Sequence, residues 1–415
     1  MMLPVETDVL IVGAGPTGLA LATALQKAGV NHLLIDALDG AQNSSRAAVV
    51  HAHTLEMLGA IDVVDRMEAQ GMAVANFVVR DRDQALLELS FDDLPSAFQH
   101  LLMIPQSSTE ALIAARLGEL GGAVHRGVSA LGATADADGA TVRVMTADGE
   151  RHIRARYVVG ADGMRSIVRE AARIGFEGEA YGESFVLADV RMDWPLGARE
   201  VSLFFSPAGL VVIAPLPDGS YRVVATLDDA PEKPGIEDIQ KLLDARGPTG
   251  GARVTDIGWA SRFRVHHRLA DTYRNGPFLL MGDAAHVHSP AGGQGMNTGL
   301  VDAILLGEAL TRVVRDRASD TVLDDYARTR RPAAQGVLAL AGRLTRIATV
   351  RSVSLRRLRN MVLRVLNRVP GFKRKLALGF SGLGRAQYSV LPQSGPVPAQ
   401  RPFNRPVHST ARLAA

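Results

Sequence analysis

The chain has 415 residues, 47% apolar and 21% charged, a composition typical of a globular protein with room for two sizeable domains. It contains no cysteine, which excludes disulfides, cysteine nucleophiles and thiolate-bound clusters, and no apolar run is long enough to span a membrane. The first strand is predicted to start by about Thr7, leaving no room for a signal peptide, so we expect a cytoplasmic protein.

A strand, a glycine turn and a helix are predicted at the start of the chain. The apolar run Asp8–Val12 is typical of a buried strand. Three glycines follow it at the spacing of a dinucleotide-binding turn: Gly13, Gly15 and Gly18. The first permits the tight turn, the second lets a phosphate approach the backbone, and the third lets helix and strand pack closely. Pro16 suits the first helical turn, where its missing N–H is not needed.

The predicted helix, roughly Pro16 to Ala28, aims free N–H groups and a positive dipole end at a pyrophosphate. His32–Asp36 is the second predicted strand. Asp36 stands at its end, about 20 residues after the glycines, where a carboxylate holds ribose hydroxyls. Because a carboxylate repels a 2′-phosphate, we expect this site to take the AMP half of FAD or NAD rather than NADP.

A second glycine-rich signature lies far along the chain. Pro277–Met281 is predicted to be a short buried strand, and Gly282 and Asp283 follow at the end where ligands collect in α/β sheets. After a loop rich in proline and glycine, an apolar helical pattern begins near Gly295 and runs to about Val314. One end of a long cofactor is therefore expected at each signature, and FAD is long enough to need both.

The region between the two signatures contains alternating apolar and polar runs. Such runs predict strands of a half-exposed sheet, and the clearest are Val201–Phe205, Val211–Ala214 and Tyr221–Ala225.

Together with Gly160–Ser166, these signatures resemble the group A FAD-dependent aromatic hydroxylases, the relatives of para-hydroxybenzoate hydroxylase. Gly13–Gly18 matches the family's ADP-binding glycine motif. Gly160–Ser166 matches its DG motif, and Gly282–Gly299 its GD motif. The resemblance covers about residues 5–345. It departs from the family at His53, where relatives often carry Arg, and at Ser289, where they often carry Pro.

The resemblance implies roles for several residues at the cofactor. Asp283 would bind the ribityl chain of FAD, and Pro290 to Asn297 would wrap the isoalloxazine edge. N–H groups near Gly295, Met296 and Asn297 would stabilise negative charge on the reduced flavin. Two weaker matches place Arg46 near the pyrophosphate and Gln106 near the ribityl chain.

In the DG motif, the resemblance implies that Asp162 and Arg165 hold the cofactor and help the nicotinamide dock, although capping of an ordinary turn also explains the aspartate. His286 and His288 invite a metal interpretation, but a third ligand is missing from the pattern, so packing roles are favoured and no metal is expected.

The function implied by the resemblance is that of an FAD-dependent monooxygenase with non-covalent FAD. NADPH or NADH and O2 would hydroxylate a small aromatic or polyketide-like molecule through a flavin C4a-hydroperoxide. The alternative is an FAD-dependent reductase of an isoprenoid or quinone lipid, and a non-enzymatic FAD-binding protein is a further one. A flavin halogenase is disfavoured because Trp194 and Trp259 form no Trp-x-Trp motif.

Candidates for the substrate cavity fall in the middle of the chain. Arg262–Arg264 precede the second signature, where the family's cavity is lined. Three tyrosines are weak candidates for a catalytic base, each more easily explained as structural: Tyr181, Tyr221 and Tyr273.

The predicted fold class is α/β. A Rossmann-type, glutathione-reductase-like FAD-binding domain comprises residues 1–75, 101–178 and 276–345, and a β-sheet substrate domain comprises 76–100 and 179–275. A basic helical segment, 346–390, and a loosely ordered tail, 391–415, complete the chain.

Charge is distributed unevenly along the sequence. The net charge is +3, but residues 326–415 hold 18 of the 46 Lys and Arg and none of the 43 Asp and Glu, so residues 1–325 carry −15. The stretch Arg343 to Lys375 interleaves bases with apolar residues at helical spacing. Such a helix could lie on an anionic membrane. The favoured interpretation is instead that it packs on the acidic body with its arginine face in solvent, and nucleic-acid binding is not expected.

Overall fold

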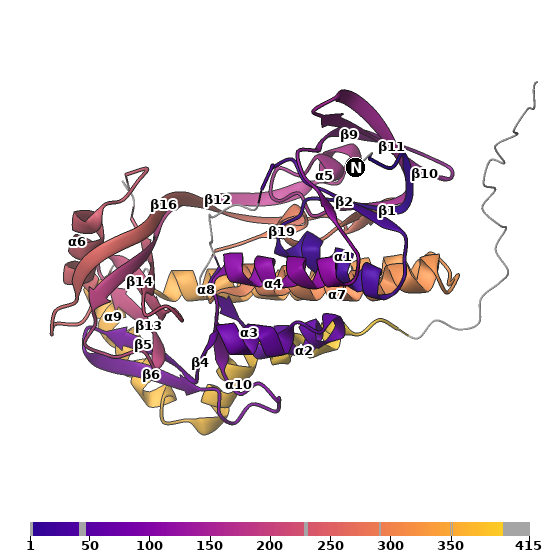
Figure 1. The fold of residues 1–415 in the computed structure, drawn as a ribbon. Helices are drawn as coiled ribbons and strands as arrows, with labels where there is room; N and C mark the ends of the chain where they lie inside the picture. Colours follow the sequence, from indigo (N-terminus) through magenta and orange to yellow (C-terminus); the bar gives the residue numbers. More distant parts are fainter. Residues whose placement is uncertain are drawn as a thin grey trace, which may run out of the picture.

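The computed structural model describes residues 3–40, 47–227, 231–289, 292–348, 350 and 352–392, without the side chains of 180–183, 264–265 and 345. Two predicted cofactor residues, Arg46 and Pro290, lie outside the described residues, as does the tail from residue 393 onward. Two lobes, each built on an eight-stranded sheet, lie side by side in Figure 1.

The first lobe contains a mainly parallel sheet in the order β17-β18-β11-β1-β2-β8, with β10 and β9 added antiparallel beside β11. Parallel pairing joins β18, β11, β1, β2 and β8. The strands are β1 Glu6–Val12, β2 His32–Ile35, β8 Val124–His125, β9 Ser129–Asp136, β10 Gly139–Thr146, β11 Gly149–Gly160, β17 Arg274–Asn275 and β18 Phe278–Leu280. Both glycine signatures follow parallel strands, β1 and β18, so they open at the same edge of the sheet.

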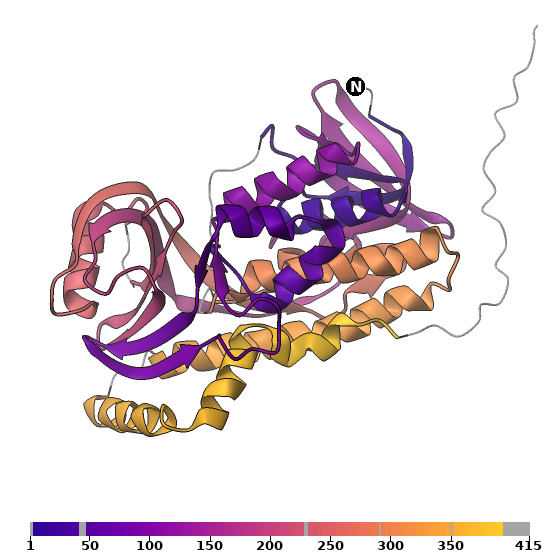
Figure 2. The same cartoon turned by 60° about the horizontal axis from the view of Figure 1, so that its bottom comes forward.

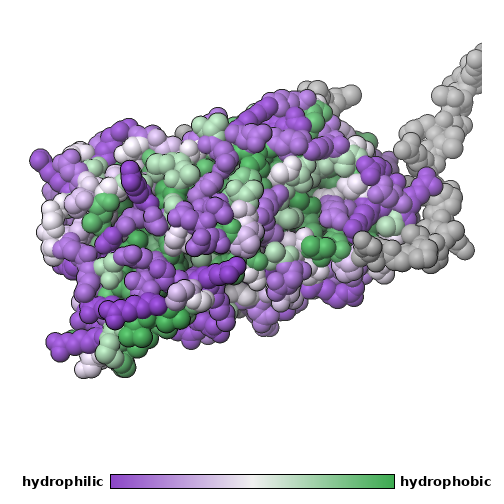
Figure 3. Space-filling view, turned by 90° about the horizontal axis from the view of Figure 1, so that it is seen from below, coloured by the Kyte–Doolittle hydropathy of each residue, from purple (hydrophilic) through white to green (hydrophobic). Residues whose placement is uncertain are grey.

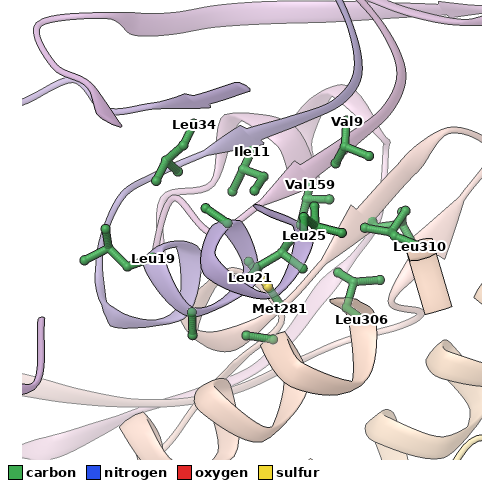
Figure 4. Packing of buried hydrophobic residues seen from close by; sticks show 14 of the residues in the cluster. Val9, Ile11, Leu19, Leu21, Leu25, Leu34, Val159, Met281, Leu306 and Leu310 are labelled. Carbon is green, nitrogen blue, oxygen red and sulfur yellow. The ribbon is translucent and has the colours of Figure 1, made fainter. Parts of the chain in front are cut away.

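Helices pack on this sheet and bury its apolar strands. They are α1 Pro16–Lys27, α4 Gln106–Glu119, α7 Gln294–Val314 and α8 Thr321–Ala348. Leu21 of α1 lies against Leu306 of α7 and Val159 of β11 in the core (Figure 4). The Cβ of Ala24 in α1 lies 2.9 Å from the position that a Cβ would take on Gly307 of α7, so the absence of a side chain at Gly307 lets the two helices pack closely. This close packing holds the two signatures together.

The second lobe contains a mostly antiparallel sheet in the order β19-β16-β12-β15-β14-β13-β5-β6. Its strands are β5 Asn76–Asp81, β6 Gln84–Ser90, β12 Phe176–Asp193, β13 Glu200–Ser206, β14 Gly209–Pro215, β15 Tyr221–Thr226, β16 Arg253–Ala270 and β19 His286–Val287. The predicted strands at 201–205, 211–214 and 221–225 are confirmed within two residues at each end. The 18-residue strands β12 and β16 extend from this sheet to the first lobe (Figure 1).

Side chains alternate between the two faces of the second sheet. One face packs against α6 (Ile236–Arg246) through residues such as Val211 and Val223. The other face carries the neighbouring positions, Val212 and Val224, toward the space between the lobes. The two-residue period of the sequence therefore builds a core on one side and a cavity wall on the other.

Short elements connect the lobes. A three-stranded sheet has the order β3-β7-β4, and the remaining short helices and 3-10 turns lie in the connections of the chain. These elements are β3 Val49–Val50, β4 Met72–Val74, β7 Leu101–Met103, α2 Ala52–Leu58, η1 Gly59–Ile61, α3 Val64–Gln70, α5 Ile167–Ala171 and η2 Gly282–Ala284.

The C-terminal part of the described chain returns along the underside of both lobes (Figure 2). It forms α9 Val353–Leu366, α10 Pro370–Phe380 and η3 Leu383–Ser389. Phe380 stacks at 5.0 Å on Phe77 of β5, and Arg330 of α8 donates to the carbonyl of Tyr388. None of the helices in the described part of the chain is both long and apolar enough to cross a bilayer.

The favoured interpretation of the basic segment is wrong in one respect. We expected α9 to pack its apolar residues on the body and to expose only arginines. Instead Leu355, Leu358 and Val365 are more than half exposed, while Asn360 is the buried residue of this helix. The helix packs on the body through polar contacts and through Leu363, so hydrophobic spacing alone predicted the wrong inward face.

Candidate functional site: a cavity between the two lobes

The first glycine turn is closed by backbone contacts that leave no room for side chains. Gly13 has φ +103°, and a Cβ there would lie 2.4 Å from the carbonyl oxygen of Ala161. A Cβ on Gly18 would lie 1.9 Å from the carbonyl oxygen of Gly13. Gly15 differs, because its Cβ position has no described residue within 4 Å apart from its neighbours in the chain. No side chain caps the N-terminus of α1, so its N–H groups face open space beside Gly15.

Asp36 lies at the end of β2 and bonds to the glycine turn. Its Oδ2 accepts a hydrogen bond of 2.6 Å from the Ala14 N–H, and its Oδ1 accepts one of 2.9 Å from the Leu38 N–H. Arg126 lies 3.4 Å from Oδ1. These contacts fix the orientation of the Asp36 carboxylate beside the first turn of α1.

The second signature forms the floor beside α1. Gly282 has φ +56° and lies against Thr17, and Asp283 follows in η2 with its side chain exposed toward the cavity. Gly292 and Gly293, at φ +88° and +60°, turn the chain into α7. That helix also begins without a side-chain cap. The predicted helix from 295 to 314 is thus confirmed to within one residue.

Asn297 ties the start of α7 to the neighbouring segment. Its Oδ1 accepts a 2.8 Å hydrogen bond from the N–H of His51, and its Nδ2 donates to the carbonyls of Val49 and Gly293 at 2.9 and 2.8 Å. Gly295 and Met296 line the cavity. The side chain of Asn297 therefore holds the loop, and the N–H groups of the first helical turn face the cavity.

Buried charged residues form a hydrogen-bonded network behind the loop that leads into α7, and the sequence analysis did not predict it. Asp302 of α7 accepts hydrogen bonds from the Gly282 N–H at 3.1 Å, from His286 Nε2 at 2.7 Å and from Arg330 Nε at 2.7 Å. Burial alone would raise the pKa of Asp302, but the charges of Arg330 and His286 hold it below its usual value. The sequence did contain a signal for this network. Asp302 lies 20 residues after Gly282 inside an apolar helix, and a carboxylate is rarely buried in such a helix unless it is paired.

Asp162 of the Gly160–Ser166 segment caps α5. Its Oδ2 accepts hydrogen bonds from the N–H groups of Ile167 and Val168 at 2.8 and 3.2 Å, and burial raises its pKa. Arg165 is exposed and does not line the cavity. Arg169 makes the connection to the second signature by donating to the carbonyl of Ala284 at 2.9 Å.

These elements enclose a cavity of about 530 Å³ between the lobes. One end is polar and is lined by Gly15, Gln106 and Asp283. The other end is apolar and is lined by Phe185, Leu203, Val212, Val224 and Phe263 of the second sheet and by Leu344 of α8. Residues as far apart in the sequence as Gly15 and Leu344 thus meet around one cavity.

The chain matches a family model described as the FAD binding domain over residues 6–341. It is 35% identical over 359 residues to the 6-methylpretetramide 4-monooxygenase of Streptomyces rimosus, covering 84% of this chain and 64% of the relative. The anhydrotetracycline hydroxylase OxyS from Streptomyces rimosus superposes with a TM-score of 0.77 at 34% identity, covering 91% of this chain and 76% of that one. The p-nitrophenol 4-monooxygenase of Pseudomonas putida superposes with a TM-score of 0.83 at 25% identity, covering 92% and 98%.

The chain belongs to the FAD-dependent aromatic hydroxylase family. It carries an FAD-binding domain, and the predicted fold class and family are confirmed. It spans about two thirds of the length of the curated relatives that it matches.

Two histidines of this family member are held neutral at the cavity. Burial lowers the pKa values of His51 and His288 to about 4. His51 Nε2 lies 3.1 Å from the carbonyl of Gly292, and His288 Nδ1 lies 2.9 Å from that of Ser289. His288 Nε2 finds no hydrogen-bond partner among the described residues, and this ring lies about 4 Å from the Cβ position of Gly295.

Arg222 joins the second sheet to the first lobe and was also missed. It is 2% exposed, forms two 2.7 Å hydrogen bonds to Asp189, and donates to the carbonyl of Ala47 at 2.6 Å. Its position on β15 faces the cavity. A single arginine in an alternating strand gave no sequence signal that distinguished it from a surface residue.

The other residues predicted near the substrate differ in whether they line the cavity. Phe263 lines the cavity, whereas Arg262 lies 3.5 Å from Glu232. Tyr221 packs on Trp194, and Tyr273 is fully buried against His286, so neither lines the cavity. The side chains of Tyr181 and Arg264 lie outside those described.

Proposed function

We propose that the protein is an FAD-dependent monooxygenase that hydroxylates an extended aromatic or polyketide-like substrate. An aromatic C–H bond is replaced by C–OH. One atom of O2 enters the product and the other leaves as water, and NAD(P)H and a proton supply the two electrons and the two hydrogens. The observation that carries the proposal is the single cavity whose polar end is formed by both glycine signatures and whose other end is apolar.

The residues of the polar end fit FAD. The open space at Gly15 and the uncapped N-terminus of α1 suit a pyrophosphate, which would fill the place that no Cβ occupies. Gly13 and Gly18 close that turn, Pro16 starts its helix, and Asp36 would hold the adenosine ribose. When bound, FAD supplies storage of two electrons and activation of O2.

Other residues would hold the remaining parts of the cofactor. Asp283 and Gln106, both at the cavity, would bind the ribityl hydroxyls beside Gly282. Arg46 would lie near the pyrophosphate and Pro290 at the isoalloxazine edge. Asp162 orders the DG turn through α5, and the exposed Arg165 would meet NADPH or NADH at the surface.

The start of α7 would stabilise negative charge at the reacting end of the cofactor. N–H groups of Gly295, Met296 and Asn297 lie in an uncapped first turn, where the helix dipole contributes up to about 2 kcal/mol in good geometry. The Asn297 side chain is already used to hold the turn in place. We therefore assign it a positioning role and assign the stabilisation to the backbone.

The apolar wall favours a substrate with little charge. Apolar side chains of the second sheet and Leu344 of α8 form it, and the arginine beside it, Arg222, is already paired with Asp189. An apolar wall also excludes water from the reacting atoms. Two relatives are named as monooxygenases of 6-methylpretetramide and of anhydrotetracycline, which supports a polyketide-like substrate here.

The test is oxygen incorporation. The FAD-loaded protein is incubated with NADPH or NADH under 18O2 and a panel of phenols, naphthols and anhydrotetracycline-like tetracycles, and products are analysed by mass spectrometry. We expect one 18O atom per product and NAD(P)H consumption that rises with substrate. Reduction of a quinone or isoprenoid lipid that proceeds equally without O2, and leaves no label in any product, would replace the proposal by the reductase alternative.

A further inference from the structure

The outward face of α9 is apolar and uncovered. Its exposed residues recur three and four positions apart, which places them on one side of the helix. They are Leu355, Leu358, Met361, Val362 and Val365, exposed by 58, 51, 56, 43 and 59%. Figure 3 shows hydrophobic residues gathered along the edge where this helix lies. We call these five residues the α9 face.

Polar contacts, together with Leu363 packed against a hydrophobic cluster, hold the opposite side of α9 on the body, so its orientation is specific. Asn360 donates a hydrogen bond of 2.5 Å to Asp81, and Arg364 contacts Gln84. The guanidinium of Arg359 lies 4.6 Å from the ring centre of Phe205 and donates to the carbonyl of Ile347 at 3.0 Å. Turning the α9 face inward would break these contacts.

The α9 helix itself carries four arginines and no acidic residue. Arg357 and Arg364 are exposed on the same helix, and no acidic residue follows Asp325 in the chain. A cavity of about 460 Å³ lies between α9 and the second sheet. Its charged lining residues are Arg82, Arg246, Arg356, Arg357 and Asp81. Four arginines against one aspartate leave this lining with an excess of positive charge.

We propose that α9 docks on an anionic phospholipid bilayer, with the α9 face among the upper acyl chains and the arginines at the phosphates. A 14-residue helix is about 21 Å long, so a stripe about 10 Å wide offers on the order of 200 Å². A stable protein interface needs about 800 Å² from each partner. The stripe is therefore small for a dimer and sufficient for a surface helix.

Other occupants match the charge less well. Two copies of α9 meeting face to face would bring their arginines together, which is unfavourable. The chain beyond Pro392 contributes three arginines and no acid, and Pro392 itself contacts Arg312 of α7, at the end of the molecule away from α9 in Figure 1.

Docking would place the membrane next to the apolar end of the main cavity. α9 follows α8, whose Leu344 and Ala348 line that cavity, and Arg359 also donates to the carbonyl of Ala348 at 3.4 Å. An apolar substrate dissolved in the bilayer would then be concentrated near the cavity wall. This last point rests on the proposed function, whereas docking itself does not.

Vesicle flotation of the FAD-loaded full chain tests the docking. Vesicles contain phosphatidylcholine alone or with one third phosphatidylglycerol. We expect at least tenfold more protein to float with the anionic vesicles, and high salt to reduce the fraction. The triple variant Leu358→Gln/Met361→Gln/Val365→Gln should lose this binding. A matched control, Leu131→Gln/Met145→Gln, removes exposed apolar residues of the first lobe and should float like the wild type.

Three outcomes would overturn the docking. The first is equal flotation with both vesicle types, or none. The second is a wild-type dimer in sedimentation velocity that the triple variant dissociates, because a second copy would then cover the face. The third is flotation only after residues 393–415 are removed, since the chain's own tail would then cover it. Oxygen incorporation by the triple variant, measured without vesicles, separates failure of docking from failure of the proposed reaction.

Discussion

The two ends of the main cavity are built in opposite ways. The polar end is shaped by backbone: two glycine turns, two uncapped helix N-termini and carboxylates at strand ends. The apolar end is shaped by side chains from separate strands and from α8. The polar end depends on a few glycine positions that tolerate almost no substitution. The shape of the apolar end depends on many side chains, each of which contributes a small part. We therefore expect substitutions at the two ends to differ in kind as well as in size.

The largest expected effect separates two glycines of the same turn. Gly18→Ala places a methyl group 1.9 Å from a backbone oxygen, so we expect it to destabilise the FAD-free protein by at least about 4 kcal/mol. Gly15→Ala meets no described residue within 4 Å beyond its chain neighbours, so it should leave that stability within about 1 kcal/mol while weakening FAD binding at least tenfold. Urea unfolding and flavin titration measure the two effects. Equal loss of stability in both variants would contradict this division.

Asp302→Asn should have the next largest effect. The substitution leaves the buried guanidinium of Arg330 without its counter-charge, which destabilises a protein by about 3–5 kcal/mol. Because the folded pKa of Asp302 is lowered, its stabilisation is present above the unfolded pKa and is lost as pH falls through the folded value. Asp316→Asn, in an exposed pair with Arg315, is the control and should change the free energy of unfolding by less than about 1 kcal/mol.

A pH series tests the buried histidines of the cavity. The pKa of His288 falls to about 4 in the folded protein, so the unfolded chain binds its proton first as pH drops below about 6.5. Stability is therefore lost between pH 6.5 and 4, and His288 accounts for about 2 kcal/mol of that loss at pH 5. His288→Gln should flatten the fall in urea midpoint between pH 7.5 and 5. The exposed His152→Gln should leave the fall as steep as in the wild type.

The smallest effect on stability is expected at the apolar wall. Val212→Phe adds volume to a half-buried side chain facing the cavity and should change stability by less than about 1.5 kcal/mol, with FAD content unchanged. The KM for a tetracyclic substrate should rise more than tenfold, and that for a simple phenol should stay within threefold. Val5→Phe, at an exposed site, is the control. Loss of flavin from the Val212 variant would show that the two ends are not independent.

The same contrast explains what the sequence could predict. Elements at the polar end were predicted closely because glycine spacing, strand ends and helix starts are local properties: α1 and α7 begin within one residue of expectation. Asp302 and Arg222 were missed because their partners lie far away in sequence, at Arg330 and Asp189. The orientation of α9 was wrong because amphipathic spacing identifies two faces and does not say which one meets the body.

The strands β12 and β16 have a consequence for how the molecule unfolds. Their paired register runs from Phe176 and Ala270 near the first lobe to Asp193 and Arg253 in the second. Because these two paired strands of the second sheet extend into the first lobe (Figure 1), we expect the two lobes to melt as one cooperative unit. A single calorimetric transition is expected, and two separable transitions would contradict it. A substitution in the apolar wall that destabilises the second lobe would then lower the stability of the FAD-binding lobe by the same amount, which limits how far the wall can change.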